Sequence, residues 1–157
     1  MSKIISKYVE VLVFRRNKNL IEYLILQRGT KEKIYPNIWQ VITGKIKKNE
    51  NAIQTAIREL KEETFLKPIS LWKINYINSF YDEKNDEINL NPMFAVEIDF
   101  DSKIKISNEH QKYIWCVFNK CQKLLVWRGQ KETIKIFHKL LQRKNQKEIY
   151  LTKIDIA

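Results

Sequence analysis

The stretch from Asn51 to Glu63 constrains the fold most, because it has the pattern of a helix with one apolar face. Asn51 can cap this helix, with Gln54 three residues later as in a capping box. Pro68 follows and prevents a long continuation. A helix with a single apolar stripe must bury that stripe against another layer. The stripe recurs at helical spacing and consists of Ala52, Ile53, Ala56, Ile57 and Leu60.

Runs of β-branched and aromatic residues predict the layer on which this helix packs. Tyr8–Phe14 and Ile21–Gln27 flank the turn signal Asn17-Lys18-Asn19, so they predict a hairpin. Strands mixed with a few helices predict an α/β fold, a sheet with helices on its faces, in a single domain over residues 1–157. Further strands are expected at Trp39–Ile42, Leu71–Tyr81, Met93–Phe100, Tyr113–Phe118 and Ile149–Ile156, and a second helix at Thr133–Leu141. The polar segments Arg28–Asn37, Lys45–Asn49, Asp82–Asn91 and Lys144–Glu148 are expected to be loops or linkers.

The composition excludes several classes of protein. A hydrophobic fraction of 44% with only 3 Gly and 3 Pro does not suit a disordered chain. No apolar run approaches the ~18 residues of a membrane span, and the N-terminus lacks the apolar region of a signal peptide. Two cysteines, Cys116 and Cys121, are too few for a disulfide framework or a zinc site. We therefore expect an intracellular, cytoplasmic location.

The net charge of +11, from 29 Lys and Arg against 18 Asp and Glu, favours polyanionic partners. Phosphates, nucleic acid and an anionic membrane surface all have the required chemistry. The chain is also rich in Lys, Ile and Asn, as AT-rich genomes tend to encode, and such compositional drift explains the charge equally well. Charge alone does not name the substrate.

Three carboxylates share one face of the predicted helix. Glu59, Glu62 and Glu63 stand at i, i+3 and i+4, where side chains are neighbours. Such carboxylates repel and raise one another's pKa, and negative charge is unfavourable near the C-terminal end of a helix. Magnesium or manganese is the natural counter-charge, since oxygen ligands suit these ions. The plain alternative is a solvated acidic face, screened by Arg58 and nearby lysines.

The spacing around this cluster resembles the Nudix box: Gly, five residues, Glu, seven residues, Arg-Glu-aliphatic-x-Glu-Glu-x-Gly-aliphatic. The order of the flanking strands is also similar to that of the Nudix α/β/α sandwich with its mixed sheet. The resemblance implies a metal-binding hydrolase, a pyrophosphatase that cuts a nucleotide-like substrate with Mg²⁺, or Mn²⁺, as cofactor. The positions that match in register are Gly44, Glu50, Arg58, Glu59, Leu60, Glu62, Glu63 and Leu66.

The resemblance also implies roles for the box residues. Glu62 and Glu63 would be the main metal ligands, and the Gly44 carbonyl would contribute. Glu59 would be either a further ligand or the base that activates water. The chemistry agrees, since hydrolysis of a phosphoanhydride needs charge neutralisation and an activated water, and divalent ions held by carboxylates supply both.

Three more charged residues belong to the predicted site. Arg58 is expected to pair with Glu50 or another box carboxylate, and Glu50 to be mainly structural. In many Nudix enzymes a Glu on a loop before a late strand joins the metal site or acts as base. Glu109 has that position, ahead of Tyr113, although an exposed loop Glu is the alternative. His110 is expected to be an ordinary polar or packing residue.

Candidate residues on the substrate side are Arg28, Trp39 and Gln40. Arg28 ends a predicted strand and has the chemistry to grip a phosphate bidentately, or it is a solvated surface residue. Trp39 has the chemistry to stack on a base or pterin ring, although core packing is favoured for a Trp. Gln40 lies beside it, just before Gly44.

Three short patterns are similar to the dihydroneopterin triphosphate pyrophosphatase branch of the family, which also accepts dATP. They are Leu-Gln-Arg, Trp-Gln-x-x-Thr-Gly, and Glu-His-x-x-Tyr-x-Trp. Dinucleoside polyphosphate hydrolases share several of these features, so a diadenosine polyphosphate hydrolase is the enzymatic alternative. A nucleic-acid-binding protein on a Nudix scaffold is not favoured, because a binding module gains nothing from a repulsive carboxylate cluster.

Phe65 departs from the box, since it stands where the family has its second glycine. That glycine suits the positive φ of a turn that leaves a helix. Either Phe65 keeps this backbone and stores strain, or the turn is rebuilt with the ring buried. We expect the rebuilt turn, because the ring offers much apolar area to bury and Pro68 can redirect the chain.

Overall fold

Nine strands are present in the part of the chain that the computed structural model describes, residues 1–143 and 147–156, and they form one sheet. They are β1 (Lys3–Ile5), β2 (Tyr8–Asn17), β3 (Leu20–Arg28), β4 (Trp39–Gln40), β5 (Ile42–Lys45), β6 (Ser70–Asp82), β7 (Glu87–Glu97), β8 (His110–Cys116) and β9 (Lys153–Ile154). The main path runs β4-β3-β2-β7-β6-β9, while β1 pairs with β7, β5 with β2 and β8 with β3. The pairs β2–β7 and β1–β7 are parallel and the others antiparallel, so the sheet is mixed, as expected.

Strand β2 lies at the centre of this sheet and is buried on both faces. Val11 and Val13 belong to one apolar cluster, whereas Leu12 and Phe14 belong to the other. Successive side chains of a strand point to opposite faces, so each face of the sheet needs a covering layer. These two layers complete the α/β/α arrangement that the sequence predicts.

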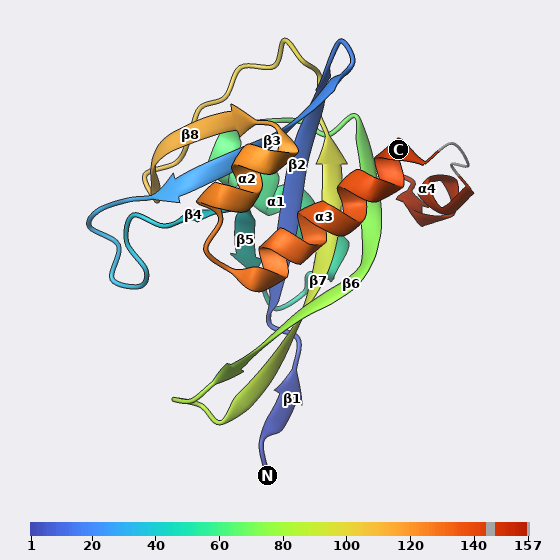
Figure 1. Ribbon diagram of the computed structural model, residues 1–157. Coiled ribbons are helices and arrows are strands. Elements are labelled where there is room, and N and C mark those ends of the chain that lie inside the picture. Colours follow the sequence, from blue (N-terminus) through green and yellow to red (C-terminus); the bar gives the residue numbers. More distant parts are fainter. Residues whose placement is uncertain (144–146, 157) are drawn as a thin grey trace.

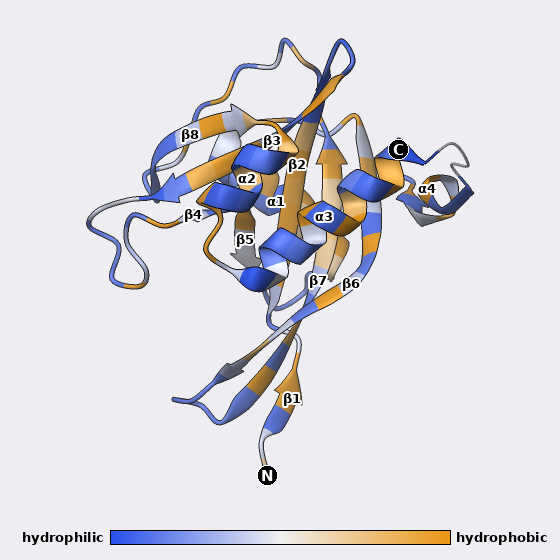
Figure 2. Cartoon of the chain, in the orientation of Figure 1, coloured by the Kyte–Doolittle hydropathy of each residue, from blue (hydrophilic) through white to orange (hydrophobic). Residues whose placement is uncertain are grey.

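Helices cover the two faces from opposite sides (Figure 1). Helix α1 (Ala52–Thr64) packs its apolar stripe on the Val11 side, while α2 (Phe118–Leu124) and α3 (Arg128–Gln142) cover the Phe14 side. The outer surfaces of α2 and α3 are largely hydrophilic (Figure 2). None of the helices in the described part of the chain combines the length and apolar character needed to cross a membrane.

The start of α1 confirms the predicted capping box. Asn51 Oδ1 accepts a hydrogen bond from the Gln54 backbone N–H at 2.9 Å, and Gln54 Oε1 accepts one from the Asn51 N–H at 2.9 Å. These reciprocal bonds satisfy backbone groups that a helix start leaves without partners. The sequence therefore specifies the position of α1 locally.

The predicted loop Asp82–Asn91 is wrong in its second half, because β7 begins at Glu87. Together with β1 and β6 this segment forms a narrow arm that extends from the sheet (Figure 1). Its polar residues alternate with Ile88 and Leu90, and the amide of Asn91 is buried in a hydrogen bond to Glu10. Polar composition masked the strand, because the Asn91 Nδ2 group finds its partner only in the tertiary structure, at Glu10.

The C-terminal predictions also need correction. The expected strand Ile149–Ile156 is mostly helix α4 (Lys147–Thr152), followed by the two-residue β9. Ile149 packs against the apolar cluster below α3, and this contact favours the helical turn. Helix α3 begins at Arg128, earlier than the predicted Thr133, and α2 was not expected. Of the predicted linker Lys144–Glu148, residues 144–146 lie outside the described residues and the other two are helical.

The turn after α1 keeps the left-handed backbone, so the expectation of a rebuilt turn is wrong. Phe65 has φ 60° and ψ 12°, and its N–H donates to the Lys61 carbonyl at 2.9 Å. The ring is 58% exposed, while the next residue, Leu66, is buried at 2%. Lys105 Nζ lies 5.2 Å from the ring centroid. Phe65 therefore carries the strain of a left-handed residue without the benefit of burial.

We expect Phe65→Gly to leave the melting temperature unchanged or to raise it. Glycine removes a left-handed strain of roughly 1 kcal/mol, and the loss of an exposed cation–π contact offsets part of this gain. A net gain of about 1 kcal/mol would raise Tm by about 2–4 °C in a domain of this size. Calorimetry on both proteins measures the shift.

Phe65→Ala is the matched control. It removes the ring but keeps the Cβ that makes positive φ costly, so this variant should melt below Phe65→Gly. An equal or higher melting temperature for the alanine variant would show that the backbone at this position is not strained.

Candidate active site

The carboxylate face of α1 lies against β5, and Gly44 makes this approach possible. A Cβ built at Gly44 would overlap the Cγ and the carboxylate of Glu59. Only glycine therefore lets a helix side chain lie directly on this strand. The box glycine and the first of the clustered carboxylates are thus brought together by packing between helix and strand.

Arg58 connects most of the box carboxylates. Its Nε and Nη2 donate to Glu50 at 2.6 and 2.9 Å, which is a bidentate pair. Its Nη1 donates to Glu59 at 2.6 Å and to Glu62 at 3.0 Å, and Nη2 also donates to the Lys45 carbonyl at 2.9 Å. The guanidinium lowers the pKa of Glu50 from 4.5 to about 2. The expected pairing of Arg58 with Glu50 is therefore present.

Glu63 points away from this arginine and into the protein. Its side chain is only 5% exposed, and its Oε2 shares a hydrogen bond of 2.6 Å with His110 Nε2, whose side chain is 1% exposed. Burial raises the pKa of Glu63 from 4.5 to about 7, although the bond to His110 opposes the rise. Repulsion from Glu109 and Glu59 raises this pKa further.

Glu109 is held beside Glu63 by the loop that precedes β8. The Ser107 N–H donates to the Glu63 carbonyl at 3.0 Å, and the Gly29 N–H donates to the Glu109 carbonyl at 2.8 Å. The side chain of Glu109 is exposed. Ligand atoms of Glu63, Glu109 and His110 all lie within 4.8 Å of one another. The loop thus adds a carboxylate and an imidazole to the end of α1.

Electrostatic coupling joins these two groups of residues into one site. Burial raises the pKa of half-buried Glu59, and repulsion from Glu62 and Glu109 adds to the rise. Glu62 is the most open member, since its side chain is 54% exposed and contacts both Arg58 and Lys47. The site is therefore an acidic cluster, partly buried and partly open to solvent, that has Arg58 at its centre.

The predicted substrate-side residues do not join this cluster. The guanidinium of Arg28 donates to the Ile34 carbonyl at 3.0 Å and pairs with Glu32 at 3.1 Å, so it holds its own loop. Trp39 packs against the apolar cluster under α3, and Gln40 is buried at 7%. The core role that we favoured for Trp39 is therefore present.

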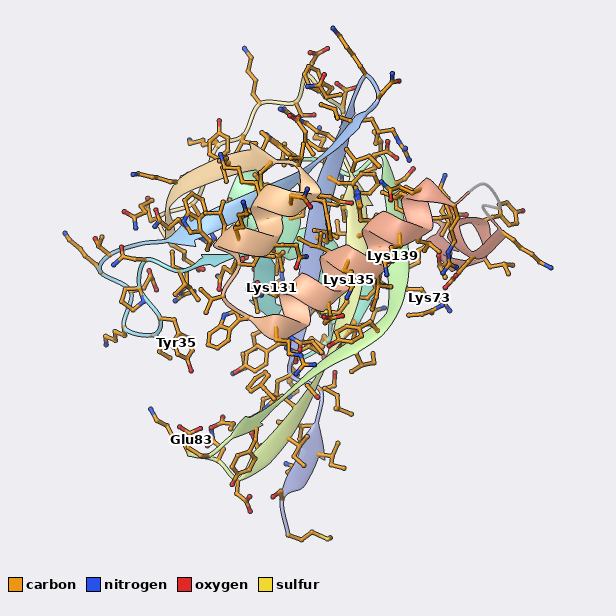
Figure 3. All side chains as sticks on the ribbon, viewed as in Figure 1. Tyr35, Lys73, Glu83, Lys131, Lys135 and Lys139 are labelled. Atoms are coloured by element: carbon orange, nitrogen blue, oxygen red, sulfur yellow. The ribbon has the colours of Figure 1, made fainter. Side chains whose placement is uncertain are left out.

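An aromatic pair, of which Tyr35 is exposed and Trp127 is partly buried, lies near β4. The rings of Tyr35 and Trp127 meet edge to face with centroids 4.8 Å apart, and Tyr35 is 57% exposed in the loop before β4 (Figure 3). Trp127 comes directly before α3. The Tyr35 ring is thus more accessible to a base than the partly buried Trp39.

The structure also contains a buried carboxylate that the sequence pattern did not mark. Glu10 is 3% exposed and accepts hydrogen bonds from Asn78 at 2.7 Å, Asn91 at 3.1 Å and Gln130 at 2.9 Å. Gln130 in turn accepts from the Val41 N–H at 3.2 Å. The only signal was a charged residue inside an apolar run. This network ties β2, β6 and β7 to α3.

Comparison with known proteins connects this geometry to one family. The family model described as the NUDIX domain matches residues 7–138. Over 142 residues the chain is 28% identical to the asymmetrical bis(5′-nucleosyl)-tetraphosphatase of Mus musculus, a match that covers 83% of this chain and 92% of that protein. A 99-residue stretch, 62% of this chain, is 30% identical to an octanoyltransferase of Myxococcus xanthus, of whose length the match covers only 28%.

Solved structures agree in fold. The C. elegans Ap4A hydrolase in a binary complex superposes with a TM-score of 0.72 at 22% identity, covering 87% of this chain and 98% of that one. The E. coli dihydroneopterin triphosphate pyrophosphohydrolase superposes with a TM-score of 0.67 at 21% identity, covering 85% and 99%. At these identities the likeness shows the shared fold and does not by itself identify the substrate.

We expect the metal-free protein to lose stability as the pH rises from about 5 to about 8. The folded-state pKa of Glu63 is about 7 against 4.5 for an ordinary glutamate, so in this window the folded state keeps a proton that the unfolded chain releases. The full shift corresponds to roughly 3 kcal/mol. Urea-unfolding midpoints in EDTA at successive pH values measure the loss.

The matched controls are Glu63→Gln and Glu97→Gln. The first replaces the titrating group with a neutral one and should flatten the slope, whereas the second alters a surface glutamate paired with Arg16 and should retain it. The lowered pKa of Glu50 acts only below pH 4.5, outside this window. The raised pKa of Glu59 adds to the loss of stability and the lowered pKa of His138 opposes it, and both contributions remain in Glu63→Gln. An unchanged slope in Glu63→Gln would contradict the assignment.

Proposed function

Because the chain belongs to the Nudix family and is a pyrophosphohydrolase by that membership, we propose that it hydrolyses a phosphoanhydride bond of a nucleoside polyphosphate with Mg²⁺ or Mn²⁺. One observation carries the proposal. Glu59, Glu62 and Glu63 meet Glu109 at one end of α1, and the described residues supply mainly Arg58 as counter-charge. Such a cluster is costly for folding unless it has a cation to hold.

The donor atoms fit a divalent ion. Carboxylate oxygens are the ligands that Mg²⁺ and Mn²⁺ prefer, and ligand atoms of Glu63, Glu109 and His110 converge within 4.8 Å. The glycine at position 44 leaves the strand backbone open to the helix carboxylates. When bound, such an ion neutralises charge on phosphate oxygens and lowers the pKa of a coordinated water.

The residues then divide into ligands and groups that position them. Glu62 and Glu63 would be the main ligands, and the Gly44 carbonyl would contribute, as the resemblance to the Nudix box implies. Glu59 would be a further ligand. Glu109 would either join the ligands, since its carboxylate lies within 4.8 Å of that of Glu63, or act as the base, since its side chain is open to solvent.

Two residues, Arg58 and His110, position the carboxylates and need not contact the substrate themselves. Arg58 contacts Glu50, Glu59 and Glu62, so it fixes the spacing of the carboxylates and does not need to touch substrate. His110 orients the buried carboxylate of Glu63 through their 2.6 Å hydrogen bond. The packing role expected for His110 is thereby replaced, in this proposal, by a positioning role.

A dinucleoside polyphosphate is the substrate class that we favour. The murine tetraphosphatase aligns with nearly its whole length, well beyond the box. Tyr35, which is 57% exposed and meets Trp127 edge to face, offers an aromatic ring of the kind on which a nucleobase stacks. The net charge of +11 also favours a substrate with several phosphates.

Dihydroneopterin triphosphate is the second candidate, supported by the pattern Glu109-His110-x-x-Tyr113-x-Trp115. In the structure Trp115 lies under the Arg15 guanidinium, 4.3 Å from ring centroid to Cζ, and packs against the core. This part of the pattern is therefore satisfied by packing and offers less support for pterin binding.

We expect hydrolysis only in the presence of a divalent ion, and a loss of at least ~10²-fold in kcat for Glu62→Gln and for Glu63→Gln, as when an electrostatic catalytic group is removed. Each change keeps the size of the side chain but removes a charged ligand. Phosphate or nucleotide release from diadenosine tetraphosphate, followed by chromatography, measures it.

Glu148→Gln is the matched control. Glu148 lies on α4, where it pairs with Arg143, and its substitution should leave the rate unchanged. Full activity in excess EDTA would contradict the metal requirement. Near-normal turnover in both box variants would place the metal elsewhere.

We expect diadenosine tetraphosphate to give a higher kcat/KM than dihydroneopterin triphosphate or dATP. We also expect it to be cut asymmetrically, into two nucleotides with different numbers of phosphates. The reason is the full-length similarity to an asymmetrical tetraphosphatase. Initial rates on the three substrates with Mg²⁺ measure the order, and a higher value for the pterin would assign the chain to that second candidate.

A further inference from the structure

The positive charge of this protein is concentrated in its C-terminal third. Residues 110–157 contain 11 of the 29 Lys and Arg but only 3 of the 18 Asp and Glu. This segment therefore carries +8 of the net +11. The asymmetry comes as much from the scarcity of acids in this segment as from its lysines, so most of its cations have no neighbour of opposite charge in the sequence.

The cations of helices α2 and α3 are also left without acidic partners. They are Lys120, Lys123, Arg128, Lys131, Lys135 and Lys139, and within residues 1–143 and 147–156 no carboxylate pairs with any of them at 4.0 Å or less. Elsewhere acids are matched to bases, as in Arg15–Glu22 and Arg16–Glu97. The fold therefore keeps six cations on a layer whose helices α2 and α3 carry one carboxylate, Glu132, so the cations repel one another unless an anion binds.

Three of these lysines form a regular row. Lys131, Lys135 and Lys139, the lysine row, follow one another at four-residue intervals along the side of α3 that is turned away from the sheet (Figure 3). With a rise of 1.5 Å per residue, neighbours in the row are about 6 Å apart along the helix. Evenly spaced cations suit a ligand with evenly spaced anionic groups.

A groove of about 760 Å³ lies beside the row and has a different character. Its floor includes Ile21, Phe118 and Leu141, and Phe118 stacks on His138 with centroids 4.7 Å apart. Lys18, from the β2–β3 turn, lines the groove together with Lys135 and Lys139 of the row. The groove thus combines an apolar and aromatic floor with a cationic rim.

We propose that the lysine row and this groove bind a single strand of nucleic acid, with phosphates along the row and bases in the groove. Cationic tracks beside aromatic surfaces are the general means of binding such strands without sequence preference. A membrane fits less well along the row, because no large hydrophobic residue within the described helix α3 is exposed; the exposed hydrophobic residues Leu20 and Val117 line the groove and not the row. The face lies across the sheet from α1 and its carboxylates, so the binding is additional to the proposed hydrolysis, although Lys131 lies one turn after Trp127 of the proposed base-stacking surface.

The test uses the full chain in EDTA, so that hydrolysis cannot contribute. Fluorescence anisotropy with a labelled 20-nucleotide RNA and the DNA of the same sequence gives Kd over a series of salt concentrations. The row variant carries Lys131→Gln, Lys135→Gln and Lys139→Gln. We expect its Kd to rise at least ~10-fold at 100 mM salt. The slope of log K against log salt concentration should be smaller by about 2, since each single-strand phosphate contact contributes about 0.7. A difference between the RNA and DNA arms identifies which strand is preferred.

The matched control is the triple variant Lys67→Gln, Lys84→Gln, Lys103→Gln, which removes the same charge from exposed positions off this face. It should bind nearly as tightly as the unaltered chain. Equal weakening of oligonucleotide binding in both triple variants would overturn the proposal in favour of a net-charge effect. Failure of the unaltered chain to bind either oligonucleotide at 50 mM salt would also overturn it. Binding to phosphatidylserine vesicles is measured on the same proteins. If the row variant loses vesicle binding but keeps oligonucleotide binding, the face is assigned to membranes and the proposal is overturned. Unchanged melting temperature and diadenosine tetraphosphate turnover in the row variant would show that any loss of binding does not come from the fold or the hydrolytic site.

Discussion

The guanidinium of Arg58 is the group on which the carboxylate cluster depends. It contacts Glu50, Glu59 and Glu62 within 3.0 Å, and a bidentate pair with Glu50 fixes its own orientation. The planar fork of an arginine can serve several carboxylates at once, which a lysine cannot. Because Arg58 and Lys47 do not balance the surrounding carboxylates, the cluster remains acidic. That imbalance makes the end of α1 suitable for a metal ion.

Two buried carboxylates show how the sheet supports this site. Glu63 is satisfied by His110 from the start of β8, whereas Glu10 is satisfied by carboxamides from β6, β7 and α3. A buried charge is costly unless it has hydrogen-bonding partners, so both networks hold particular strands and helices in register. Both faces of β2 are also buried. Helix α1 and its carboxylates lie on one side, and the basic α2–α3 layer lies on the other.

The parts of the site that could be predicted are those determined by short-range sequence. The capping box at Asn51, the helix after it and the Arg58–Glu50 pair all form within a few turns of one helix. His110 was not identified, because its contact with Glu63 joins residues 47 positions apart in the chain. Arg28 has the chemistry of a phosphate ligand, but the folded loop uses it for Glu32 and a carbonyl instead.

The sequence by itself determined the family, the carboxylate helix and the mixed sheet with helices on both faces, since periodicity and spacing are properties of neighbouring residues. Tertiary structure decided where polar or apolar composition was ambiguous. Residues 87–91 became a strand because β1 and β6 pair with β7 and the amide of Asn91 reaches Glu10, and residues 149–152 became a helix because Ile149 packs on the core. Phe65 kept the left-handed turn because the end of α1 and the buried Leu66 fix the backbone there, and a side chain alone cannot override that geometry.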